Sequence, residues 1–194
     1  MEKKLPVTID GREFQALPGQ TILEVARENG IYIPTLCYFP MTTLVGACRV
    51  CVVEVEGARN LVAACAMPVN PGMVIKTDTE RVREARRLVV ELLWASGDHN
   101  CLMCEQTGNC ELQDLAYSLG VRERLFEGER KDLPGDSTSL SVIRDPSKCI
   151  LCGRCYRVCS EVQGVCNLSQ QGRGFTTVVT PAHGAEMDHS VCIQ

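Results

Sequence analysis

The chain has 194 residues, of which 45% are hydrophobic, and it carries 20 Lys and Arg against 24 Asp and Glu. This length suits one large domain or two to three small ones. No basic stripe points to nucleic acid, and no apolar run is long enough to cross a bilayer. The N-terminal residues lack the apolar segment of a secretory signal, so we expect a cytoplasmic protein. In that compartment the 13 cysteines stay reduced, and such density indicates metal binding.

Residues 1–78 have the pattern of a small α+β domain. The dipeptide Asp10-Gly11 stands between two β-rich segments and predicts a hairpin. A capping box that begins with Thr21 predicts a short helix over 21–29. Three more β-rich segments follow, at 50–55, 60–65 and 72–77. A hairpin, a helix and further strands in this order favour a ubiquitin-like β-grasp.

Two helices are predicted in the middle of the chain. Apolar residues repeat at helical spacing over 79–96, and Thr77 and Glu80 form a second capping box before them. A similar repeat follows Cys110 and ends at Gly120.

The C-terminal part is separated from these helices by a polar stretch with Gly and Pro at 127–137, which predicts a linker. Beyond it, a β-rich run at 175–180 predicts a strand.

The C-terminal part contains four cysteines in the pattern Cys-x2-Cys-x2-Cys-x3-Cys, namely Cys149, Cys152, Cys155 and Cys159. This is the bacterial ferredoxin run for a [4Fe–4S] cluster. A tight loop lets three thiolates converge on one cluster while backbone N–H groups point at its sulfurs. The alternative is a zinc knuckle, because Cys-x2-Cys pairs also suit tetrahedral zinc. Four cysteines in so short a run favour the cluster.

The N-terminal part contains four further cysteines in the order Cys37-x10-Cys48-x2-Cys51-x13-Cys65. Plant-type [2Fe–2S] ferredoxins use a related order with a shorter first gap. The β-grasp pattern around these cysteines supports the same cofactor. Zinc is again the alternative.

The middle part contains three cysteines and a nearby histidine. Cys101, Cys104 and Cys110 need a fourth ligand for a [4Fe–4S] cluster, and His99 is the nearest donor. A neutral imidazole in place of a thiolate removes negative charge and should raise the reduction potential, as in Rieske centres. The alternative is a solvated histidine at a helix end.

The remaining candidates carry weaker signals. Cys166 is predicted to be a buried structural thiol, and His183 and His189 to be surface residues. Four cationic residues lie near the last block, namely Arg144, Lys148, Arg154 and Arg157. They form either a solvated charged face or a set of positive charges that offsets the negative charge of the cluster. No dinucleotide fingerprint, Walker motif or catalytic triad stands out, so we expect no catalytic centre in this chain.

The three blocks, in this order, resemble an iron–sulfur region shared by three groups of proteins. These are the large peripheral subunit of respiratory complex I, the diaphorase iron–sulfur subunit of NAD-reducing hydrogenases, and the N-terminal part of multi-cluster [FeFe] hydrogenases, including electron-bifurcating ones. The resemblance rests on 37–65, 101–113 and 145–159. Complex I places its ligand histidine at the position of Gly97, whereas a histidine two residues before Cys101 is similar to the hydrogenase diaphorase subunits.

The resemblance implies one [2Fe–2S] cluster and two to three [4Fe–4S] clusters that relay electrons. Its implied partners are a flavin subunit that binds NAD(P), a small thioredoxin-like [2Fe–2S] subunit, and a terminal catalytic subunit, most simply a hydrogenase. A formate dehydrogenase, another bifurcating complex or a complex I-like enzyme would use the same relay. A zinc-stabilised interaction module is the alternative from a different class.

Taken together, the sequence predicts an α+β chain of three domains. A β-grasp [2Fe–2S] ferredoxin-like domain is expected at 1–78, and a small helical domain with a His/Cys3 cluster at 79–137. A bacterial ferredoxin-like [4Fe–4S] domain is expected at 138–194, incomplete at its C-terminal end.

This incompleteness is inferred from Cys192, which stands where a second ferredoxin run would begin. In a two-cluster ferredoxin each run lends its fourth cysteine to the other cluster. Cys159 and Cys192 would then share an adjacent [4Fe–4S] cluster, and the first three cysteines of the run would take their fourth ligand from beyond residue 194. We therefore expect a piece of a longer chain. The alternative is a single third cluster closed locally by Cys159 or Cys192.

Overall fold

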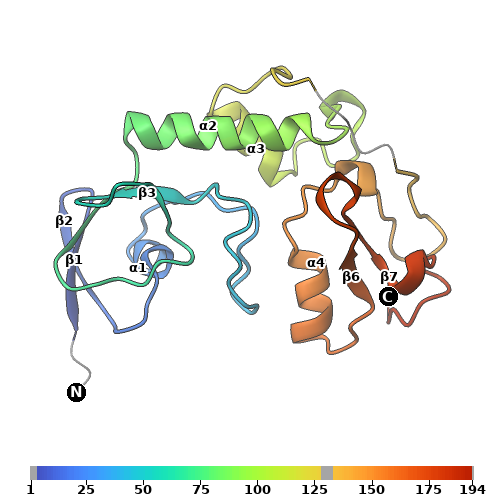
Figure 1. Cartoon of the computed structure of the whole chain (residues 1–194), viewed down its shortest axis with the longest axis horizontal. Coiled ribbons are helices and arrows are strands. Elements are labelled where there is room, and N and C mark those ends of the chain that lie inside the picture. Colours follow the sequence, from blue (N-terminus) through green and yellow to red (C-terminus); the bar gives the residue numbers. More distant parts are fainter. Residues whose placement is uncertain (1–3, 128–132, 194) are drawn as a thin grey trace. The chain divides into compact units, whose positions relative to one another are not determined.

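The computed structural model describes residues 4–127 and 133–193, and the chain divides into two compact units (Figure 1). The first unit contains Met1–Tyr38, Leu44–Val90 and Asp114–Arg122. The second contains Phe39–Thr43, Glu91–Gln113 and Glu123–Gln194. No helix in the described ranges is both long and apolar enough to cross a membrane.

The first unit is built on a five-stranded sheet. Its strand order is β2 (Arg12–Ala16), β1 (Leu5–Ile9), β5 (Met73–Lys76), β3 (Val52–Val55) and β4 (Val62–Ala63). β1 pairs antiparallel with β2 and parallel with β5, while β3 runs antiparallel to both of its neighbours. Asp10 and Gly11 both have positive φ, at 48° and 78°, which is the backbone of the two-residue hairpin turn that the sequence predicts.

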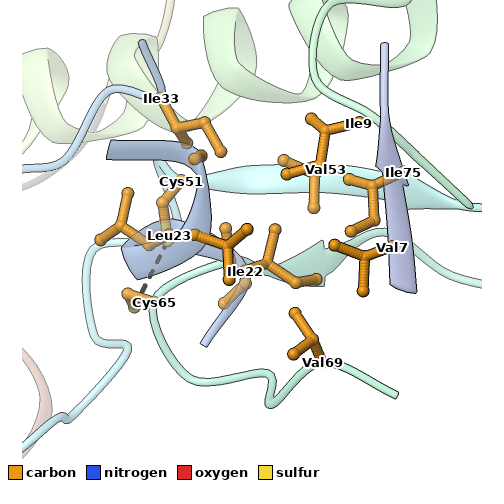
Figure 2. Close-up of a cluster of buried hydrophobic side chains, with 14 of the residues drawn as sticks. Val7, Ile9, Ile22, Leu23, Ile33, Cys51, Val53, Cys65, Val69 and Ile75 are labelled. Carbon is orange, nitrogen blue, oxygen red and sulfur yellow. Dashed lines mark hydrogen bonds between the residues drawn. The ribbon is translucent and has the colours of Figure 1, made fainter. Parts of the chain in front are cut away.

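Helix α1 (Ile22–Glu28) begins and ends where the sequence predicts. The Thr21 hydroxyl accepts from the Glu24 amide at 3.3 Å, and the Glu24 carboxylate accepts from the Thr21 amide at 2.7 Å. At the other end Gly30, with φ 71°, donates to the Arg27 carbonyl, and Ile31 donates to the Ala26 carbonyl. The helix buries its apolar side chains in one core with the strands (Figure 2): Ile22, Leu23, Val25 and Ala26.

Helix α2 (Glu80–Ala95) is confirmed, but its predicted capping box is wrong. The hydroxyl that accepts from the Val82 amide belongs to Thr79, at 3.2 Å. Thr77 instead donates its amide and its hydroxyl to the carboxylate of Asp10, at 2.7 and 2.6 Å. Thr77, which the sequence spacing assigned to the start of the helix, therefore binds Asp10 in the hairpin turn instead. Helix α3 (Glu111–Ser118) follows Cys110 as predicted.

The second unit contains a short helix, a π-helical turn and a hairpin: α4 (Arg154–Arg157), η3 (Val158–Val162), β6 (Leu168–Gln171) and β7 (Val178–Pro181). The strand predicted at 175–180 starts only at Val178, because Gly174–Thr176 forms a 3₁₀ turn. Of the predicted linker, 128–132 lie outside the described residues. Asp136, near its end, is buried and accepts from the Met187 amide at 3.0 Å, so this end belongs to the folded unit.

Candidate iron–sulfur centres

Four buried thiols converge in the first unit. Cys37, Cys48, Cys51 and Cys65 are between 1% and 7% exposed, and the sulfurs of Cys51 and Cys65 lie 3.4 Å apart (Figure 2). Hydrogen bonds from Cys48 and then Cys65 lower the pKa of Cys37 to about 2, and that from Cys65 lowers the pKa of Cys51 to about 7. The same contacts raise the pKa of Cys48 and of Cys65. The four thiols therefore lie close enough to perturb one another's pKa values, as the ligands of one metal centre would.

The loop that carries these thiols is tightly wound. Arg49, directly after Cys48, has φ 58° and lies in the left-handed region, which turns the chain sharply between two of the cysteines. Leu23 and Ile33 are among the buried side chains near Cys51 (Figure 2). Apolar side chains therefore cover the inner side of the site.

Three half-buried thiols lie together in the second unit. Cys101 opens a 3₁₀ turn, and Cys110 directly precedes α3. Burial raises the pKa of Cys101, and the neighbouring thiols Cys110 and Cys104 raise it further. Gln113 contacts the Cys101 thiol and also accepts from the Gly108 amide at 2.8 Å. The first turn of α3 thus supports the loop.

His99 lies in the same unit. Its Nε2 is 3.2 Å from the carbonyl oxygen of Leu93, and its ring stands 5.6 Å from that of Trp94. Burial lowers the pKa of His99, which favours the neutral imidazole. Within the described ranges, the hydrogen bonds and ring contacts of His99 go to these two residues and none goes to the three cysteines. His99 as a cluster ligand therefore stays a prediction.

The loop of the last block points amide groups at its thiols. The Leu151 amide donates to the sulfur of Cys149 at 3.4 Å, and the Asn167 amide donates to that of Cys159 at 3.2 Å. Leu151 and Gly153 both have positive φ, at 55° and 75°, so the chain turns tightly between successive cysteines. Amide donors of this kind stabilise thiolates and their clusters.

Arg157 is a buried side chain that holds the cysteine loop of the last block by hydrogen bonds to its backbone. It is 3% exposed, and its Nε donates to the Gly153 carbonyl at 3.1 Å. The same guanidinium donates to the Thr42 hydroxyl at 2.7 Å and the Thr43 carbonyl at 2.6 Å, which fixes the short segment 39–43 in the second unit. The other three cations predicted near this block pair with Asp136, Asp145 and Glu111. Their charge is balanced by carboxylates rather than held free for a cluster.

The isolated cysteines and histidines have different outcomes. Cys166 is exposed, so its prediction as a buried thiol is wrong. Its φ of 55° belongs to a turn in which its amide donates to the Cys159 carbonyl, and the side chain faces solvent. His183 and His189 are exposed, as predicted. Cys192 is half-buried, and no hydrogen bond in the described residues joins it to Cys159, so their shared cluster stays a prediction.

The spacing of the thiols bears on the zinc alternative. Among the described residues, no group of three or more His, Cys, Asp or Glu side chains is arranged to hold a single metal ion. The sulfurs of Cys51 and Cys65 lie 3.4 Å apart. That separation suits two thiolates on one iron of a cluster as well as two thiolates on one zinc ion, so metal analysis is the measurement that distinguishes them.

The comparisons with known proteins agree with this geometry. A chain in the crystal structure of NAD+-reducing [NiFe]-hydrogenase in the H2-reduced state matches with a TM-score of 0.86 and 37% identity, over 92% of this chain and 75% of that chain. This chain belongs to the same family of iron–sulfur subunits. Within it, residues 2–80 match the 2Fe-2S iron-sulfur cluster binding domain, 86–124 the NADH-ubiquinone oxidoreductase-G iron-sulfur binding region, and 142–160 the 4Fe-4S binding domain.

Curated relatives extend beyond the region that they share with this chain. NADP-reducing hydrogenase subunit HndD of Solidesulfovibrio fructosivorans is 46% identical over 193 residues, which are 97% of this chain and 33% of that protein. The mitochondrial NADH dehydrogenase [ubiquinone] iron-sulfur protein 1 of Solanum tuberosum is 38% identical over 173 residues, which are 89% of this chain and 23% of that protein. The predicted fold class, family and combination of [2Fe–2S] with [4Fe–4S] clusters are confirmed.

The sequence reasoning missed the groups that surround the thiols. Gln113 is 5% exposed and contacts the Cys101 thiol, although it lies within the stretch 101–113. Asn167 reaches Cys159 through its backbone N–H, which any residue except proline could supply. Arg86 is 7% exposed and donates to the carbonyl oxygen of Val52, 34 residues away, so only tertiary packing brings it beside the first block.

A matched pair of substitutions tests the first site. Cys51→Ala should remove the [2Fe–2S] signal and about two irons per chain, because one buried ligand atom is lost. Cys166→Ala, at an exposed cysteine, should leave iron content and both types of EPR signal unchanged. Metal analysis and EPR of dithionite-reduced protein make the comparison. An unchanged [2Fe–2S] signal in Cys51→Ala would exclude Cys51 as a ligand.

Proposed function

We propose that this protein relays single electrons between a partner that exchanges hydride with NAD(P)H and a terminal catalytic subunit, most simply a hydrogenase. The observation that supports this most is the convergence of thiols at separate sites in the chain. The same chain matches a chain of NAD+-reducing [NiFe]-hydrogenase and covers 75% of that hydrogenase chain. Clusters bound at these sites would accept and release one electron at a time. The residues of this chain hold, space and insulate them.

The proposed ligand sets follow the three blocks. The [2Fe–2S] cluster is held by Cys37, Cys48, Cys51 and Cys65. A [4Fe–4S] cluster is held by His99, Cys101, Cys104 and Cys110. A further [4Fe–4S] cluster is held by Cys149, Cys152 and Cys155, while Cys159 and Cys192 belong to an adjacent one. The amide donors at Cys149 and Cys159, and the 3.4 Å contact between Cys51 and Cys65, support these assignments.

Gly97 supports His99 as the fourth ligand of the middle cluster. A Cβ atom on Gly97 would lie 3.0 Å from Nε2 of His99 and 2.6 Å from the Ser147 carbonyl oxygen. The His99 ring therefore occupies the space into which a side chain at position 97 would point. Proteins that resemble complex I carry their ligand histidine at that position, and here His99 brings an imidazole to the same place. If Nε2 carries the proton and donates to the Leu93 carbonyl, Nδ1 would be the nitrogen left to bind iron.

The partners follow from the same relation. We propose a flavin subunit that binds NAD(P), a small thioredoxin-like [2Fe–2S] subunit and a hydrogenase, all in the cytoplasm. The match to NADH dehydrogenase [ubiquinone] iron-sulfur protein 1 favours a second candidate, a complex I-like relay. The position of His99, two residues before Cys101, favours the hydrogenase.

His99 can be tested by two substitutions and a control. His99→Ala should make the middle cluster labile, because the cluster then has three ligands. His99→Cys should retain it at a lower reduction potential, because a thiolate adds negative charge. His189→Ala is the control, since His189 is exposed and contacts Glu186. EPR-monitored redox titration gives both readouts, and unchanged occupancy and potential in both His99 variants would show that His99 is not a ligand.

The relay itself is tested in the native complex. Purification through a tag on this chain should recover a flavin subunit and a hydrogenase, and addition of H2 should reduce the clusters and then NAD(P)+. The Cys51→Ala complex should lose electron transfer between the two sites while hydrogen oxidation with an artificial acceptor at the hydrogenase persists. A complex that contains neither flavin nor hydrogenase would contradict the proposal and direct attention to formate or quinone chemistry.

A further inference from the structure

Arg86 places a guanidinium group beside the first cluster site. It lies on α2, is 7% exposed, and donates from NH2 to the carbonyl oxygen of Val52 at 2.9 Å. Val52 directly follows Cys51, so this hydrogen bond holds the backbone next to a proposed ligand. The Nε of Arg86 is buried and has no hydrogen-bond partner among the described residues.

Arg86 differs from the neighbouring cations of α2 in its lack of an acidic partner. Arg83 pairs with Asp78 at 2.6 Å, and Arg81 lies 3.7 Å from Glu54. Arg86 forms no ion pair in the part of the chain that the structure describes. Burial lowers the pKa of Arg86, and the more distant charge of Asp78 and the thiol of Cys51 oppose that effect. A buried cation without an anion costs free energy, so an anion is expected near it.

The [2Fe–2S] cluster is the anion that this chain would supply there. Four thiolates and two sulfides carry more negative charge than two ferric ions carry positive charge. Reduction by one electron adds further negative charge, with no bond formed or broken. A fixed cation in a poorly screened site stabilises the more negative, reduced form more than the oxidised form.

We propose that Arg86 is the buried counter-charge of the [2Fe–2S] cluster and raises its reduction potential. The inference rests on the proposed ligand set of the first block. It assigns to Arg86 a tuning role in addition to its hydrogen bond with Val52. The charge, rather than the shape of the side chain, is the property that matters.

Substitutions in the full chain separate charge from structure. Arg86→Gln and Arg86→Met remove the charge, Arg86→Lys keeps it, and Arg83→Gln removes an exposed, paired charge from the same helix. The readout is the midpoint potential of the [2Fe–2S] EPR signal, titrated with dithionite and mediators. The neutral variants should be at least tenfold harder to reduce, a shift of about 59 mV to lower potential. The Lys variant and the Arg83 control should stay within about twofold of the unaltered chain.

The outcomes distinguish the role of Arg86 from the proposed ligand set. A [2Fe–2S] cluster whose potential is the same in the Gln, Met and unaltered chains would overturn the role of Arg86 while leaving the ligand set intact. Failure of the Lys variant to load the cluster, alongside the neutral variants, would also overturn it, because charge alone would not then suffice. Absence of a [2Fe–2S] signal from the unaltered chain would instead refute the proposed ligand set.

Discussion

Four sulfur atoms brought together inside a protein repel one another once they are ionised, and water cannot screen them there. The first block faces this constraint most strongly, since its four thiols are at most 7% exposed. Cys51 and Cys65 are already in contact, with their sulfurs 3.4 Å apart. Iron bound by these thiols would supply the positive charge that offsets the repulsion, and cluster binding would then be linked to folding of these loops.

The rest of the fold serves to hold the sulfurs in place against this repulsion. In the first unit, capped helix α1 and the β1–β5 pairing fix the scaffold from which the cysteine loops project. In the second unit, Arg157 holds the loop of the last block through the Gly153 carbonyl, and amide groups donate to the sulfurs. Backbone N–H dipoles thus point at two of these thiols. Hydrogen bonds to sulfur of this kind would help set the potential of a cluster bound there.

Local patterns in the sequence predicted local structure well. The cysteine spacings indicated the cofactors, and the capping box at Thr21 and the turn at Asp10-Gly11 were found where expected. Two misses arose from contacts distant in sequence. Thr77 does not cap α2, because its amide and hydroxyl donate to the carboxylate of Asp10, 67 residues earlier. Arg86 could not be assigned, because packing alone brings it to Val52, next to Cys51. Two other errors are local: Cys166 lies exposed in a turn with φ 55°, and a 3₁₀ turn at Gly174–Thr176 precedes β7.

The most direct test of the account is the metal and sulfide content of the anaerobically purified chain, measured with its EPR spectrum. Iron and acid-labile sulfide should be present in near-equal amounts, and the reduced protein should give both [2Fe–2S] and [4Fe–4S] signals. Zinc as the dominant metal, with little sulfide and no such signals, would contradict the assignment of these cysteines to electron transfer.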